Sequence, residues 1–153
     1  MDFETILRNR RSIRDFQEME VPLSVLNEII QDTCFAPTAG NGQPCRFVII
    51  RDRPCMQRLS DESKKNLLAD LTQNPASTLK KYEATLRDDH FNVFYNAPCL
   101  VYIVGPKDIR SLDVDLALTV SYFMFSATSR GLGTCWVALG SQIRDRKTLD
   151  EIG

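Results

Sequence analysis

Apolar residues recur at helical spacing near the start of the chain and predict two amphipathic helices. The first is short, with Phe3, Ile6 and Leu7 on one face. The second begins with Pro22 in its first helical position and ends before Pro37, because the residue that precedes a proline is pushed out of the helical region. The core-facing positions of this second helix are Leu26, Ile29, Ile30 and Thr33.

Short continuous apolar runs later in the chain predict buried β-strands over residues 47–50, 99–104 and 134–139. A further helix is predicted over residues 56–71. The segment 74–96 is interpreted as a helix with a mobile lid, whose aromatic residues are expected in the core or in an interface rather than against a substrate. Strands interspersed with helices indicate a mixed α/β domain.

The most apolar part of the chain predicts a long helix from Leu112 to Arg130, about 27 Å in length. A helix that is apolar nearly all round must be buried on every side, either at the centre of the fold or between two subunits. Its apolar stretch, Leu116–Ala127, is interrupted by Thr119 and Ser121 and is too short to span a bilayer. Gly131 supplies a natural end to this helix.

Composition is that of an ordinary globular protein, with 43% hydrophobic and 25% charged residues. A length of 153 residues is sufficient for one domain with a sizeable core. The net charge of −1 provides no overall field that would attract nucleic acid or an acidic membrane, so any basic stretch must act locally.

The cysteines predict no metal site, because they form no CxxC pair and the single histidine, His90, has no Cys or His at ligand spacing. Most of them lie in apolar runs and are expected to be buried free thiols, which fits a reducing cytosol. Acidic Asp2 and Glu4 precede any apolar run, so no signal peptide is predicted and a cytoplasmic protein is expected. The cysteines are Cys34, Cys45, Cys55, Cys99 and Cys135.

The candidate binding chemistry begins with the basic stretch Arg8–Arg14. Four guanidiniums, a hydroxyl and a carboxamide fall within these seven residues, and they suit a phosphate or another planar anion. The alternative is a solvated basic face, in which Arg8 and Arg10 interact only with the C-terminal dipole of the first helix.

A second candidate is the turn Gly131-Leu132-Gly133. It is no Rossmann fingerprint, because Trp136 occupies the third glycine position and a helix precedes a strand here. Two glycines would allow the backbone to approach a flat ligand closely, while the alternative is a simple helix end. The sequence contains no recognisable nucleophile–base pair, so any redox or group-transfer chemistry would come from a bound cofactor.

Three separated segments together closely resemble the nitroreductase family of flavin enzymes, in the order and approximate spacing of that family. They are Arg10-Arg11-Ser12-Ile13-Arg14-Asp15-Phe16, then Ala36-Pro37-Thr38-Ala39-Gly40-Asn41-Gly42-Gln43-Pro44, then Gly131-Leu132-Gly133-Thr134-Cys135-Trp136. The resemblance covers essentially the whole chain. It implies an α+β fold with a mostly antiparallel sheet flanked by helices, and a homodimer whose core is the Leu116–Ala127 helix.

The same resemblance implies two FMN sites at the subunit interface. Hydride would pass from NAD(P)H through flavin N5 to a nitroaromatic, quinone or similar acceptor in a ping-pong cycle. Carried over by position, Arg10, Arg11, Ser12 and Arg14 would hold the FMN phosphate and the pyrimidine edge. Gly131, Leu132 and Gly133 would lie near the isoalloxazine. The residues reaching the flavin from the other subunit would be Pro37, Thr38, Ala39 and Asn41.

The chain differs from the family in two respects. Relatives usually continue into another strand and a basic tail, so residues 1–153 are expected to form a single domain without these. Cys45 stands where many relatives have a Trp. The alternatives are a non-catalytic flavin-binding or dimerisation module, a flavoprotein with a ferredoxin-type donor, and a basic module for RNA. The net charge and the lack of interleaved aromatics argue against the last of these.

Overall fold

The computed structural model describes residues 2–152, which form two compact units. Of these residues, unit 1 contains 2–14, 18–49 and 101–136, and unit 2 contains 15–17, 50–100 and 137–152. Helices dominate both units, and the α+β fold with an antiparallel sheet that the family resemblance implied is confirmed, although the sheet has only two strands among the described residues. The prediction that the chain forms a single domain stays a prediction.

Unit 1 begins with two predicted helices, α1 (Phe3–Asn9) and α2 (Leu23–Thr33). The carboxylate of Asp2 accepts a hydrogen bond from the Thr5 amide at 2.9 Å and so caps α1. Helix α2 begins at Leu23, one residue later than predicted, because Pro22 has an extended ψ of 140° and occupies the N-cap position. The buried side chains of α2 are Leu26, Ile29 and Thr33, which agrees with the predicted face.

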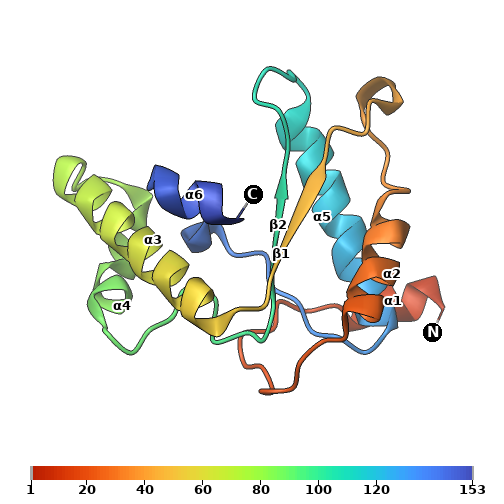
Figure 1. Ribbon diagram of the computed structural model, residues 1–153, viewed down its shortest axis with the longest axis horizontal. Coiled ribbons are helices and arrows are strands. Elements are labelled where there is room, and N and C mark those ends of the chain that lie inside the picture. Colours follow the sequence, from red (N-terminus) through yellow and green to blue (C-terminus); the bar gives the residue numbers. More distant parts are fainter. Residues whose placement is uncertain (1, 153) are drawn as a thin grey trace. The chain divides into compact units, whose positions relative to one another are not determined.

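Two strands, β1 (Arg46–Ile50) and β2 (Leu100–Val104), pair to form the sheet. Their arrows run in opposite directions in Figure 1, so the pair is antiparallel. Both strands match predicted apolar runs. A short 3₁₀ turn, η1 (Ala39–Asn41), lies in the loop that joins α2 to β1.

The long apolar helix is present as α5 (Leu112–Ser129), and it packs against α2 and α1. In the single chain α5 is not buried on every side, so it does not lie at the centre of the fold, and the predicted alternative of burial between two subunits stays a prediction. The buried residues are Asp115, Thr119, Ser126 and Ala127, whereas Val114, Leu118 and Tyr122 are exposed. Unit 1 therefore buries the polar edge of α5 and leaves an apolar stripe uncovered.

Unit 2 is organised around α3 (Arg53–Gln73), which starts earlier than predicted because Asp52 caps it and Pro54 fits its first turn. It packs against α4 (Glu83–Arg87) and the 3₁₀ turns η2 (Thr78–Tyr82) and η3 (Ala138–Gly140). The chain continues into α6 (Arg146–Ile152). Val93 and Phe94 are buried, so the aromatic part of segment 74–96 does contribute to the core, as predicted.

Two expectations about residues 134–139 and the cysteines are wrong. Only Thr134 pairs in a β-bridge, and the chain then forms irregular structure and η3 instead of a third strand. An apolar run needs a neighbouring strand with free backbone groups, and Ser12 supplies one such residue only. All five cysteines are free, but only Cys55 is fully buried, Cys34 is exposed, and Cys45, Cys99 and Cys135 are half-buried.

Candidate functional site

The predicted arginines lie immediately after α1 and have different surroundings. Arg8 forms an ion pair with Glu4 one turn earlier. The Nη1 of Arg11 donates hydrogen bonds to the carbonyl oxygens of Arg8 at 2.6 Å and Arg10 at 2.8 Å, so it closes the end of the helix. Arg10 is half-buried, and no ion pair of its guanidinium occurs within residues 2–152. Arg14 is exposed at the other end of the stretch.

The residues between these arginines join two segments that are far apart in the sequence. Ser12 forms a parallel β-bridge with Thr134, and the Ile13 amide donates a hydrogen bond to the Thr134 carbonyl at 2.9 Å. The pairing brings the Arg10–Arg14 stretch beside the Gly131–Gly133 turn. Two of the three predicted segments therefore form one cluster within unit 1.

The turn Gly131–Gly133 has a well-defined structural cause. Gly131 has φ +75°, its amide donates to the Thr128 carbonyl, and the Leu132 amide donates to the Ala127 carbonyl, both at 3.0 Å. These two bonds form a Schellman motif that ends α5. Around Gly131 the position of a Cβ is open, whereas at Gly133 it is filled by Ile13. Of the two glycines, Gly131 is the one that leaves free space for a ligand.

The polar groups of this cluster fit an anion with several oxygen atoms. The Ser12 residue is exposed beside permanently charged guanidiniums. The Oγ1 of Thr134 is buried and has no hydrogen-bond partner among residues 2–152. Such an orphaned hydroxyl is unusual in a folded protein. Trp136, two residues further on, is 60% exposed and adds an aromatic surface.

The third predicted segment, residues 36–44, lies at the opposite end of α5. The Ala39 amide donates a hydrogen bond to Asp115 in the first turn of α5, whereas the Gly131 turn follows its last residue. Figure 1 shows this separation within unit 1, with η1 beyond one end of α5. Sixteen residues of helix correspond to roughly 24 Å. Within unit 1, the residues of this loop are therefore separate from the Ser12–Thr134 cluster. They are Pro37, Thr38, Ala39 and Asn41.

The sequence reasoning missed four residues that hold these clusters: Ile13, Thr134, Asp115 and Thr119. The last two carried a readable signal, because an acid and a threonine one turn apart interrupt an otherwise apolar helix. Ile13 and Thr134 lie in segments that carry the family resemblance, but nothing in the sequence indicates their contact, because it depends on the tertiary structure.

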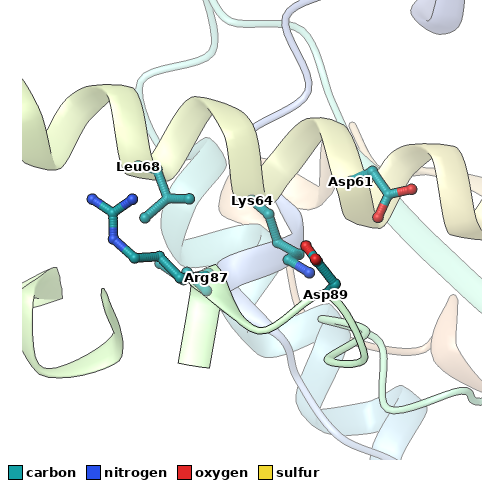
Figure 2. A pocket seen from close by; sticks show the side chains of 6 residues that line it. Asp61, Lys64, Leu68, Arg87 and Asp89 are labelled. Atoms are coloured by element: carbon teal, nitrogen blue, oxygen red, sulfur yellow. The ribbon is translucent and has the colours of Figure 1, made fainter. Parts of the chain in front are cut away.

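A shallow pocket of ≈ 390 Å³ lies elsewhere, between α3 and α4 in unit 2. Figure 2 shows Lys64 reaching from α3 toward the segment that carries Asp89. The Nζ of Lys64 donates hydrogen bonds to the carbonyl oxygens of Asp88 at 2.6 Å and Phe91 at 3.0 Å, and Arg87 pairs with Glu83. Both cations are engaged within the chain, and the lining contains no predicted site residue. The lining residues are Asp61, Lys64, Leu68, Leu86, Arg87 and Asp89.

The structure bears on three further kinds of feature: a reactive cysteine, a metal site and a membrane-spanning helix. Burial raises the pKa of the Cys99 thiol to about 11, so this cysteine is no thiolate nucleophile at neutral pH. Residues 2–152 contain no group of His, Cys, Asp and Glu side chains that could hold a metal ion. In the same part of the chain, no helix combines the length and the apolar character that a membrane span requires.

Comparison with known proteins identifies the family. Residues 7–151 match the Nitroreductase family, and this chain belongs to it. It is 21% identical over 143 residues to a putative NADH dehydrogenase/NAD(P)H nitroreductase of Methanothermobacter thermautotrophicus, with 91% of this chain and 62% of that protein covered. It is 24% identical over 147 residues to iodotyrosine deiodinase 1 of Sus scrofa, with 87% and 50% covered. The chain thus spans between half and two thirds of the length of these relatives.

A solved structure supports the fold independently. A nitroreductase with bound FMN from Bacteroides fragilis has a TM-score of 0.83 and 21% identity, and the match covers 98% of this chain and 79% of that one. At this identity the likeness establishes the nitroreductase fold.

Proposed function

We propose that this protein is an FMN-dependent oxidoreductase that transfers reducing equivalents from NAD(P)H to a small organic acceptor. The observation that carries the proposal is the Ser12–Thr134 bridge, which joins the basic stretch to the Gly131–Gly133 turn. Family membership supports the oxidoreductase class, and the FMN bound to the similar Bacteroides fragilis protein supports the cofactor.

The residues of the Ser12–Thr134 cluster fit the parts of FMN. Arg10, Arg11, Ser12 and Arg14 would hold the phosphate and the pyrimidine edge, since guanidiniums form forked hydrogen bonds with phosphate. The open side of the Gly131–Gly133 turn, including Leu132, would face the flat ring. When bound, FMN supplies N5, which accepts a hydride and returns the electrons to an acceptor. The chain's own residues bind and orient it, and their arrangement determines which acceptor can approach.

A homodimer is part of this proposal. Pro37, Thr38, Ala39 and Asn41 lie at the far end of α5, so a flavin held beside Ser12 can meet this loop only from a second copy of the chain. The exposed stripe Val114, Leu118 and Tyr122 supports the same arrangement, because a monomer would leave these apolar side chains in water. In the dimer α5 would provide the interface core.

The cofactor is tested by reconstituting the purified protein with FMN and recording its visible spectrum after gel filtration. We expect flavin absorbance to travel with the protein. Arg10→Ala and Arg14→Ala should each weaken FMN retention, whereas Arg8→Ala is the matched control because Arg8 already pairs with Glu4. Protein that emerges without flavin absorbance would overturn the proposal, and full retention by a variant would remove that arginine from the site.

The reaction is tested by adding NADH or NADPH to the loaded protein without oxygen. Bleaching of the flavin, followed by its return on addition of an acceptor, would support the proposed transfer. The acceptor panel contains a nitroaromatic, a quinone and iodotyrosine, the last because of the similarity to a deiodinase. If only a ferredoxin-type donor reduces the flavin, that donor takes the place of NAD(P)H in the proposal. If no donor bleaches the flavin, the protein is a non-catalytic flavin-binding module.

A further inference from the structure

Helix α5 presents two neighbouring sets of residues with different chemistry. Asp115 and Thr119, one turn apart, are each only 3% exposed. The positions just before them, Val114 and Leu118, are exposed and apolar. The proposed dimer contact accounts for the apolar set. The buried polar set needs a reason of its own, because polar side chains are rarely buried without a defined partner.

The carboxylate of Asp115 has a partner on each oxygen. Its Oδ1 accepts a hydrogen bond from the Ala39 backbone amide at 2.9 Å, and its Oδ2 accepts one from the Ser111 hydroxyl at 2.8 Å. It also lies in the first turn of α5, where the helix dipole favours a negative charge. A buried carboxylate held in this way has one orientation, and it fixes the backbone that it accepts from.

The loop that Asp115 holds has an unusual backbone. Gly40 has φ +56° and Asn41 has φ +55°, a left-handed conformation that Gly and Asn adopt more readily than other residues. Gln43 has φ +44°, which is uncommon for a residue of its type and persists only where surrounding contacts impose it. The Ala39 amide is the point where α5 holds this loop, directly before the first residue with a positive φ.

Thr119 holds the other end of the same loop. Its hydroxyl donates a hydrogen bond to the Asp115 carbonyl oxygen at 2.7 Å, which uses its only proton. The Cys45 Sγ lies 3.3 Å from this hydroxyl oxygen, so the thiol must be the donor in that contact. One turn of α5 thus contacts the loop both before and after its residues with positive φ.

We propose that Asp115 is the positioning residue of the flavin loop: through the Ala39 amide it holds Pro37–Asn41 in the conformation that contacts FMN in the partner subunit. This inference rests on the proposed function. It also couples cofactor binding to dimer formation, because the helix that carries Asp115 carries the apolar stripe as well. Asp115 acts through the backbone of Ala39 and itself touches no cofactor.

The proposal is tested with Asp115→Leu and Asp115→Asn, measuring the Kd for FMN by quenching of flavin fluorescence. We expect Asp115→Leu to raise the Kd about tenfold or more, because the loop is no longer preorganised. Asp115→Asn keeps an oxygen that accepts from Ala39 and should remain within about threefold of the wild type. The visible circular dichroism of the bound flavin, which reports its surroundings, should change only in the leucine variant.

The matched control is Asp113→Leu, which removes a carboxylate from the same turn of α5 at an exposed position. Its Kd should equal that of the wild type. Unchanged FMN binding in Asp115→Leu, or equal losses in Asp113→Leu and Asp115→Leu, would overturn the proposal. Equal losses in the leucine and asparagine variants would also overturn it, since the accepting oxygen would then be irrelevant.

A measurement without flavin separates this inference from the proposed function. Exchange of the Ala39 amide proton, followed by NMR, should be slow in the wild type and in Asp115→Asn, and about tenfold or more faster in Asp115→Leu. Fast exchange in the wild type would overturn the positioning role even where FMN binds. If exchange is slow but the protein binds no FMN, the hydrogen bond from the Ala39 amide to Asp115 is established and the proposed flavin site is refuted.

Discussion

The side chain of Ile13 occupies the space that a Cβ on Gly133 would need. Such a Cβ would lie 2.9 Å from Ile13 Cγ1, closer than Cβ atoms approach their neighbours in folded proteins, and 3.1 Å from Ile13 Cβ, which is a tight contact. The contact accompanies the hydrogen bond from the Ile13 amide to Thr134, so the basic stretch and the glycine turn pack directly on each other.

Gly133→Ala should therefore destabilise unit 1 by about 1–3 kcal/mol through overpacking, measured by urea denaturation. Ile13→Ala in the same chain makes room, so the double variant should lose less stability than the sum of the single variants. Gly131→Ala is the control. A Cβ at residue 131 would meet no atom, but the backbone there has φ +75°, so Gly131→Ala should lower the free energy of unfolding by about 1 kcal/mol. Adding Ile13→Ala should not reduce this loss. Strict additivity of Gly133→Ala with Ile13→Ala would refute the packing explanation.

Lys64 is expected to stabilise unit 2 by holding residues 88–91 on α3. It is 8% exposed, and its two hydrogen bonds go to the carbonyls of Asp88 and Phe91. Lys64→Met keeps the apolar stem but removes both bonds, and should lower the free energy of unfolding by about 1–3 kcal/mol. Lys65→Met, at an exposed neighbouring position, should change it little. Equal effects from the two variants in chemical denaturation would contradict this role.

Acid should weaken unit 1 through Asp32. Hydrogen bonds from the Ser126 hydroxyl and the Arg130 guanidinium lower the pKa of Asp32 from its ordinary value of 3.8. Since the unfolded chain then binds the proton more readily, this stabilisation is present above pH 3.8 and is lost as the pH falls through the lower folded value. The side chain is 48% exposed, so solvent screening limits the contribution to less than about 1 kcal/mol.

The measurement is the urea midpoint between pH 2.5 and 7 for the wild type and Asp32→Asn. The variant should be less stable at neutral pH and should lose less stability in acid. Asp113→Asn, whose carboxylate is exposed, serves as the control for a change of one charge. Parallel pH curves for the wild type and Asp32→Asn would show that Asp32 is not the group responsible.

A charge on the exposed stripe of α5 should abolish the proposed homodimer. Leu118 is 38% and Tyr122 is 39% exposed in the single chain, so Leu118→Glu should leave the monomer folded while placing a charge in the subunit contact. Light scattering after gel filtration should report a dimer for the wild type and a monomer for Leu118→Glu. Asp113→Lys changes charge on the same helix outside the stripe and should remain dimeric. A dimeric Leu118→Glu would exclude this stripe as the interface.

Much of the local structure could be predicted from the sequence because its causes are local. Helical spacing of apolar residues located α1, α2 and α3, and continuous apolar runs located β1 and β2. The end of α5 at Gly131 followed from the freedom of glycine to adopt a positive φ. The family was recognisable because three short segments occur together in one order.

The tertiary structure decided what these elements contact. The run from Thr134 to Leu139 has the composition of a strand, but it finds only Ser12 as a partner and forms no strand. Helix α5 is mostly apolar, yet packing buries its polar residue Asp115 and exposes its apolar residue Leu118. Periodicity reports which residues share a face, whereas burial and hydrogen bonding depend on which distant segment covers that face. The pairing of Ser12 with Thr134, and that of Asp115 with Ala39, are therefore properties of the folded chain alone.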